Sequence, residues 1–279
     1  MENFKIPIVR HFDEIDDLSD GIRDQELLPN QKEKARNIAE VISAELEKDS
    51  QEAVFFVTST RKRTIQTADL IIEALKNINP DIKTFKTEEE DLSAIREGEF
   101  ILPEGYSPGD YFIGLEVAAD AFSNEVHAEE RGLEKDNYLY RHGDPLLQED
   151  GSYKYPELLE YFKSSGENYK EVLLRIYRLI IKTHKKSHKL TKNTKVALLT
   201  HGQPAQIFKD LNAVAVKIKS GLVTVEAGQL ASLCWKEYQN RDESERVPGQ
   251  TDVVTIEYLQ DEDLIQVLQS EVDYLEALN

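Results

Sequence analysis

Apolar residues in this chain gather in three short runs, each of which leads into a polar turn. The runs cover 4–9, 53–57 and 195–200, and they are rich in β-branched and aromatic residues. Runs of this length and composition are typical of buried strands, which have apolar neighbours on both faces. We therefore predict three buried strands at these positions.

Three longer segments have apolar residues at the spacing of one helix face. These segments are 31–47, 63–77 and 169–184. In such a pattern the apolar side of each helix packs on a core and the polar side faces water. Because the segments alternate with the predicted strands, the sequence indicates an α/β fold with a mainly parallel central sheet covered on both faces.

The pattern is weaker elsewhere. Between 100 and 165, prolines and glycines interrupt it, so we interpret this stretch as an insertion with one helix near 110–122. The apolar runs LVTVEA, QLASLCW and DVVTIEYL within 222–260 suggest two or three further strands, and a final helix is expected near 262–277. We predict one domain over 1–279 that contains the insertion.

Composition narrows the possible partners. The net charge is −19, from 53 acidic and 34 basic residues, which disfavours nucleic acid and anionic membranes as partners. No apolar stretch reaches the roughly 18–20 residues of a membrane span. The first residues lack a secretory signal pattern, and the single cysteine, Cys234, allows no internal disulfide. A cytoplasmic location is the expectation.

Polar residues that suit phosphate chemistry follow the three predicted strands. Arg10-His11 follows the first, Ser59 to Arg63 the second, and His201-Gly202 the third. If the strands are parallel neighbours, their carboxyl ends meet at one edge of the sheet. Arginine there would bind a dianionic phosphoryl group, and a neutral imidazole could attack phosphorus while a protonated second histidine stabilises charge. This chemistry requires no metal or cofactor.

These motifs, in this order, resemble those of the histidine phosphatase (phosphoglycerate mutase-like) superfamily. The matching positions are Arg10-His11, Ser59, Arg63, Gln66-Thr67-Ala68, Gly166-Glu167, Arg175 and His201-Gly202. The resemblance implies a three-layer α/β/α fold with the insertion over the active-site edge. It also implies a phosphohistidine at His11 and phosphate contacts from Arg10, Arg63, His201 and Gly202.

The chain departs from the family pattern at several positions. Phe12 replaces a glycine and is expected to narrow the mouth of the pocket, and Asp17 stands where an asparagine often contacts phosphate. Ala94 matches the position of the usual acid glutamate, so Glu97 is the first candidate for the general acid and Glu99 the second. A second Arg-His pair, Arg141-His142, follows no convincing strand, and we interpret it as an exposed loop; the alternative is that His142 lines the mouth of the pocket. His127, His184 and His188 have no acidic or cysteine partners at metal-ligand spacing, so we interpret them as surface residues.

The function that these residues suggest is hydrolysis of small phosphomonoesters. His11 would be the nucleophile, His201 a stabilising group and Glu97 the acid. Two alternatives remain: a phosphoglycerate mutase-type transfer, and a non-catalytic binding protein on a decayed phosphatase fold. A small phosphorylated substrate is the expected partner, and the sequence gives neither its identity nor the oligomeric state.

Overall fold

The structure is a computed structural model that describes residues 6–12, 27, 29–94, 169–187, 193–242, 253–256 and 262–277. The chain divides into two compact units, of which the first comprises 1–15, 24–94 and 175–276 and the second 16–23, 95–174 and 277–279. The insertion expected at 100–165 and its helix near 110–122 lie outside the described residues. The arrangement as one domain with an insertion therefore stays a prediction.

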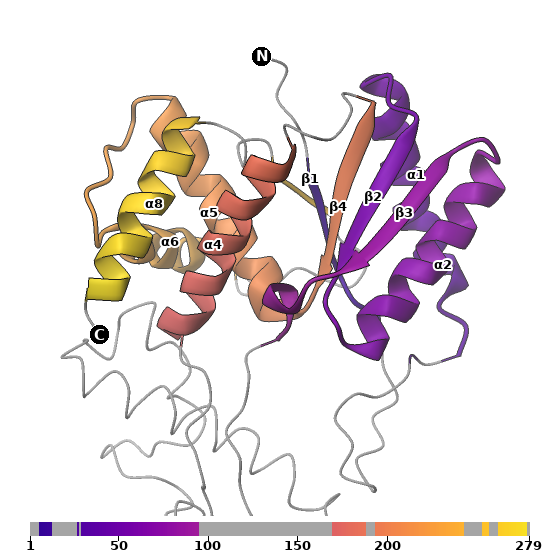
Figure 1. Cartoon of the computed structure of the whole chain (residues 1–279), viewed down its shortest axis with the longest axis horizontal. Helices are drawn as coiled ribbons and strands as arrows, with labels where there is room; N and C mark the ends of the chain where they lie inside the picture. Colours follow the sequence, from indigo (N-terminus) through magenta and orange to yellow (C-terminus); the bar gives the residue numbers. More distant parts are fainter. Residues whose placement is uncertain are drawn as a thin grey trace, which may run out of the picture. The chain divides into compact units, whose positions relative to one another are not determined.

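The described strands form one sheet in the order β3-β2-β4-β1-β5 (Figure 1). Their bounds are Ile6–Arg10 for β1, Ala53–Thr58 for β2, Lys83–Glu88 for β3, Thr194–Thr200 for β4 and Val253–Ile256 for β5. β1 to β4 are parallel, and β5 is antiparallel to β1. Every residue of β4 is buried, as expected for a parallel strand covered on both faces. The three predicted strands are confirmed.

Helices α1 (Lys32–Lys48) and α2 (Lys62–Ile78) cover one face of the sheet (Figure 1). Successive side chains of a strand point to opposite faces, so alternate strand residues meet these helices. The core that the sheet shares with α1 and α2 includes Val9, Val54, Phe56, Ala197 and Leu199 from the strands. The helices predicted at 31–47 and 63–77 are confirmed.

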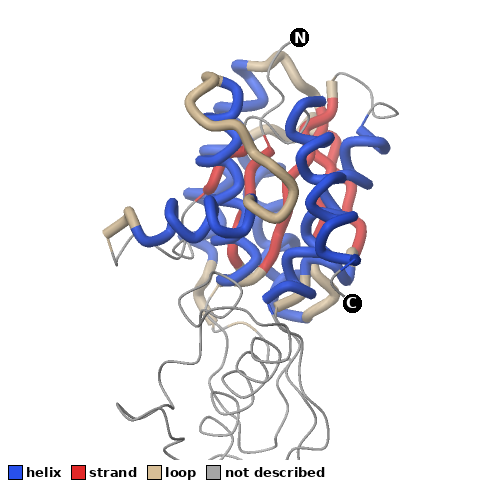
Figure 2. The backbone as a smooth tube through the Cα atoms, turned by 90° about the vertical axis from the view of Figure 1, so that its left-hand side faces the viewer, coloured by secondary structure: helices blue, strands red, loops and turns tan. Residues whose placement is uncertain are grey.

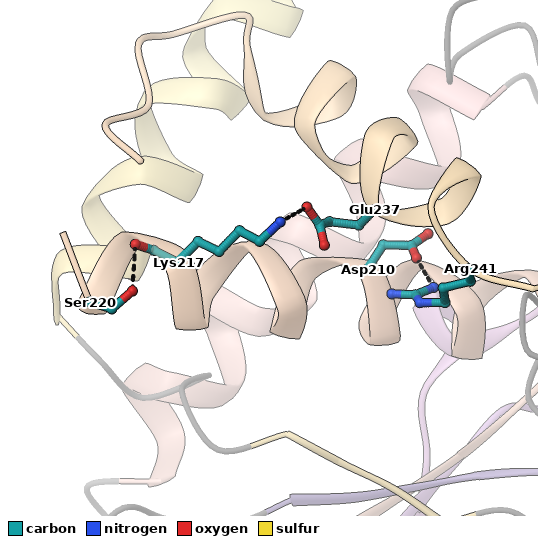
Figure 3. A network of polar contacts seen from close by, with 5 residues as sticks. All are labelled: Asp210, Lys217, Ser220, Glu237 and Arg241. Carbon is teal, nitrogen blue, oxygen red and sulfur yellow. Dashed lines mark hydrogen bonds and ion pairs between the residues drawn. The ribbon is translucent and has the colours of Figure 1, made fainter. Parts of the chain in front are cut away.

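The helices on the other side are α5 (Gly202–Lys219), α6 (Leu230–Gln239), α8 (Glu262–Ala277) and the part of α4 (Tyr169–Ser187) from Arg175 on (Figures 1 and 2). Lys217 on α5 pairs with Glu237 on α6, and Asp210 on α5 pairs with Arg241 just beyond α6 (Figure 3). The fold is therefore an α/β/α sandwich. Within the described part of the chain, no helix is long and apolar enough to cross a membrane.

The C-terminal prediction was only partly correct. β5 and α8 confirm the strand near 252–259 and the final helix, but LVTVEA is an irregular loop and QLASLCW lies in α6. The buried residues Leu230, Ala231 and Cys234 fall on one helical face, whereas Leu222 in the loop is 75% exposed. A short apolar run alone does not separate a strand from a buried helix.

The register of the strands brings their carboxyl ends to one edge of the sheet. Arg10 pairs with Thr200, and Thr58 pairs with Leu199. Because β1, β4 and β2 are parallel neighbours, the residues that follow them emerge side by side. The convergence predicted from the sequence is confirmed.

Candidate active site

His11 is the first residue after β1, and two hydrogen bonds fix it. Its backbone N–H donates to the Thr200 carbonyl at 2.9 Å, and its ring Nδ1 lies 2.7 Å from the Phe12 carbonyl oxygen. A carbonyl only accepts, so Nδ1 carries the proton and donates it. The lone pair of the neutral ring is then on Nε2. The imidazole is 6% exposed and held in the tautomer that a nucleophile attacking through Nε2 requires.

His201 follows β4 and is the N-cap residue of α5. Arg63 donates to its Nδ1 from Nε at 3.4 Å and from Nη2 at 3.3 Å, and Ser59 Oγ lies 2.9 Å from its Nε2. Because a guanidinium only donates, the lone pair of His201 is on Nδ1 and the proton on Nε2. The Nε2–H therefore donates to Ser59.

His201 is neutral in this structure. Burial, above all, holds its pKa well below the usual 6.5, and the neighbouring groups, led by His11 and Arg63, lower the pKa further. In the empty site a buried imidazolium beside a guanidinium would be both desolvated and repelled. The protonated second histidine expected during phosphoryl transfer stays a prediction.

Hydroxyl groups in the turn between β2 and α2 support the tautomer of His201 that carries its proton on Nε2. Thr64 Oγ1 donates to the Arg61 carbonyl at 2.7 Å and lies 2.7 Å from Ser59 Oγ. With the Thr64 proton used in this way, Ser59 donates to Thr64 and accepts from His201. The hydrogen bonds run in one direction from Arg63 through His201 to the turn, and each donor in the chain has an acceptor.

The two imidazoles lie close together. Their ring centroids are 5.0 Å apart and their planes are inclined by 58°. Arg63 is the second residue of α2 and reaches His201 from the neighbouring strand end. The structure therefore brings His11, His201 and Arg63 into one cluster.

Arg10 and Gly202 are the sequence neighbours of the two histidines: Arg10 precedes His11, and Gly202 follows His201. Arg10 is the last residue of β1, half-buried and in register with Thr200, and Gly202 is the first residue of α5. The backbone N–H groups at a helix N-terminus and the helix dipole favour an anion. An arginine at a strand end and a helix start next to His201 add positive potential at the same edge.

Phe12 does not line the mouth of a pocket. Its side chain is fully buried in the core between the sheet and helices α1 and α2. Its backbone N–H donates to Thr67 Oγ1 at 3.1 Å, and that hydroxyl donates to the Arg63 carbonyl at 2.7 Å. The expected narrowing was wrong because the chain turns Phe12 into the core as His11 turns towards the rim.

Sequence reasoning did not find the role of Arg175. This arginine of α4 is buried and donates to the carbonyls of Asp91 at 2.6 Å and Ala94 at 3.1 Å. The sequence analysis identified Arg175 only as one position of a family motif. Ser59, Thr64 and Thr200 were also missed as supporting groups, although the hydroxyl-rich run from 58 to 67 was visible in the sequence.

Several predicted residues lie outside the described part of the chain. They are Asp17, Glu97, Glu99, His127, Arg141, His142 and His188. His184 is described and is buried on α4, which corrects its interpretation as a surface histidine. Among the described residues, no group of three histidine, cysteine or acidic side chains could hold a metal ion.

Comparisons with known proteins add a likeness in fold. The sequence matches no protein-family model and no curated protein. Several solved structures do resemble it. One is a phosphoglycerate mutase from Bacillus anthracis (15% identity, TM-score 0.42), with 95% of this chain and 96% of that chain covered. Another is a mycobacterial glucosyl-3-phosphoglycerate phosphatase (14% identity, TM-score 0.38, coverage 82% and 84%).

A phosphoserine phosphatase from Entamoeba histolytica, solved as a mutant in complex with phosphoserine, is similar to the same degree. It has 13% identity and a TM-score of 0.40, and the match covers 90% of this chain and 89% of that one. The chain thus resembles phosphatases and a mutase. At these identities the likeness is one of fold alone.

Proposed function

We propose that this protein is a phosphatase that hydrolyses small phosphomonoesters through a phosphohistidine on His11. The observation that carries the proposal is the 2.7 Å contact between His11 Nδ1 and the Phe12 carbonyl oxygen, which leaves the lone pair on Nε2. A buried imidazole in this tautomer, beside Arg63 and a second imidazole, is suited to attack phosphorus.

In the first step, His11 Nε2 forms a bond to phosphorus while the bond to the leaving oxygen breaks. The leaving oxygen takes a proton from a carboxylic acid, for which Glu97 is the first candidate and Glu99 the second. Water then attacks the phosphohistidine, its proton returns to the carboxylate, and the N–P bond breaks. Inorganic phosphate leaves and both groups are restored.

The cationic groups stabilise charge on the phosphoryl oxygens. Arg63 presents Nε and Nη2 to His201 in the empty site, and these two donors match the spacing of two phosphate oxygens. Arg10 and the start of α5 would bind the remaining oxygens. When Arg63 turns to phosphate, Nδ1 of His201 loses its donors and would face an anion, which favours protonation of His201 in the complex.

A substrate assay tests this proposal. Purified protein should hydrolyse p-nitrophenyl phosphate, and His11→Ala should abolish turnover. Arg63→Lys keeps the charge but loses the paired donors, so we expect kcat/KM to fall by about 10²–10³-fold, as when single stabilising donors are removed elsewhere. Lys62→Met is a suitable control, because it alters the cation next to Arg63. Near wild-type turnover in Arg63→Lys would contradict the assignment.

The mutase alternative uses the same first step but returns the phosphate to a sugar acid. An assay with a phosphoglycerate separates it from hydrolysis. If the non-catalytic alternative holds, the protein would bind inorganic phosphate but would release no phosphate from an ester.

A further inference from the structure

A single hydroxyl joins the residue after His11 to the backbone of Arg63. Thr67 lies on α2, and its Oγ1 accepts from the Phe12 N–H at 3.1 Å and donates to the Arg63 carbonyl at 2.7 Å. The second bond is the common one from a helical threonine to the carbonyl four residues earlier. The first is not local, because it joins residues 55 positions apart. Thr67 therefore ties the segment that follows β1 to the first turn of α2.

Phe12 is held at three points. Its side chain is fully buried in the core, its N–H donates to Thr67, and its carbonyl accepts the proton on His11 Nδ1 at 2.7 Å. Thr67 is fully buried as well, so its hydroxyl meets the Phe12 N–H out of contact with bulk water. The position of the carbonyl that sets the tautomer of His11 thus depends on the hydroxyl of Thr67.

We propose that Thr67 is a positioning residue for the nucleophile. By fixing the backbone of Phe12, it keeps the proton of His11 on Nδ1 and the lone pair on Nε2. The inference rests on the proposed function, in which Nε2 attacks phosphorus. Without a fixed acceptor at Nδ1, a neutral imidazole places its proton on either nitrogen, and the form with the proton on Nε2 has no lone pair there for the attack. The bond to the Arg63 carbonyl holds His11 and the backbone of Arg63 in one frame.

The first test measures the tautomer of His11. In protein labelled with ¹⁵N-histidine, the protonated and the unprotonated ring nitrogen resonate far apart, and the His11 signals are those missing from His11→Ala. Spectra are recorded near pH 9, well above the usual histidine pKa of about 6.5. The Nδ1–H form should dominate in wild type. In Thr67→Val, which lacks the hydroxyl, the ratio of this form to the Nε2–H form should fall by about fivefold or more, on the order of the effect of one net hydrogen bond.

The second test measures turnover of p-nitrophenyl phosphate. In Thr67→Val, kcat/KM should fall by about tenfold or more, since a misplacement of roughly 1 Å can cost on the order of 10²-fold. Thr67→Ser keeps the hydroxyl and should return the tautomer ratio and kcat/KM to within about twofold of wild type. The matched control is Thr58→Val, because Thr58 is also fully buried and its hydroxyl has a long contact, 3.5 Å, with the Thr87 carbonyl. It should resemble wild type in both tests.

The two tests separate this inference from the proposed function. An unchanged tautomer ratio in Thr67→Val would overturn the inference, as would an equal change in Thr58→Val or a shifted tautomer with wild-type turnover. If wild-type protein hydrolyses no ester, the proposed function fails, and the tautomer ratio alone decides whether Thr67 holds His11. If Thr67→Val does not fold, Thr67→Cys decides in the same way, because a thiol is only a weak acceptor.

Discussion

At the scale of single residues, the two histidines at the sheet edge are held in opposite tautomers. His11 carries its proton on Nδ1 because its partner there, a carbonyl, only accepts. His201 carries its proton on Nε2 because the guanidinium at its Nδ1 only donates. In the proposed reaction, His11 would attack through its unprotonated Nε2. His201 would accept a proton on Nδ1 once an anion replaces that nitrogen as the acceptor for Arg63.

This arrangement predicts that binding of a dianion takes up a proton. The pKa of His201 lies well below 6.5 in the empty site, and a bound dianion raises it, so the complex holds more protons than the free protein. Affinity should therefore increase as the pH falls through the pKa of His201 in the complex and should level off below its pKa in the empty site, by at most about tenfold per pH unit for one proton. Calorimetric titration with sulfate measures this cleanly, because sulfate stays a dianion over that range.

The control is His201→Gln, whose amide can accept from Arg63 and donate to Ser59 but does not titrate. Its sulfate affinity should vary less with pH than that of the wild type. The same pH dependence in both proteins would assign the proton to another group. A flat profile in the wild type would show that no proton is taken up.

At the scale of elements, the turn before α6 depends on a glycine and on α8. Gly228 has φ +86°, and its N–H donates to Glu271 Oε2 on α8 at 2.7 Å. A Cβ at this position would lie 2.6 Å from Cε1 of Tyr274, also on α8. The backbone conformation and the close approach of the ring both favour glycine.

Gly228→Ala should therefore destabilise the fold more than Gly221→Ala. Gly221 has φ +71° with no atom within 4 Å of an added Cβ, so its variant carries only the backbone strain of about 1–2 kcal/mol. We expect roughly 1–3 kcal/mol more for Gly228→Ala, the usual cost of overpacking. Urea unfolding of both variants measures the difference. Equal losses would mean that the Tyr274 ring moves aside without cost.

The same scale shows what could be predicted from the sequence. The strands at 53–57 and 195–200 and the helices that follow the first two predicted strands were predictable, because burial on one or both faces leaves a local pattern. The start of α6 was not predictable, since QLASLCW has no local feature that excludes a strand. The contact between Ser59 and His201 joins residues 142 positions apart, and no local pattern records such a pair.

At the scale of the whole molecule, a net charge of −19 opposes the capture of a dianion. The described site offsets this negative charge locally, because Arg10, Arg63 and the N-terminus of α5 lie at one edge of the sheet. Long-range repulsion acts mainly on the rate of encounter, whereas these groups act on the bound phosphate at short range. In the proposed hydrolysis, binding of the phosphoryl group would therefore depend on these few cationic groups.

The most direct test of the account is to trap the phosphoryl group. Protein mixed with a ³²P-labelled phosphomonoester and quenched in alkaline denaturant should carry label that survives base and is released by acid. Peptide mapping should place the label on His11, and His11→Ala should carry none while His142→Ala labels like wild type. Label on His142, or full turnover in His11→Ala, would contradict a phosphohistidine mechanism at His11.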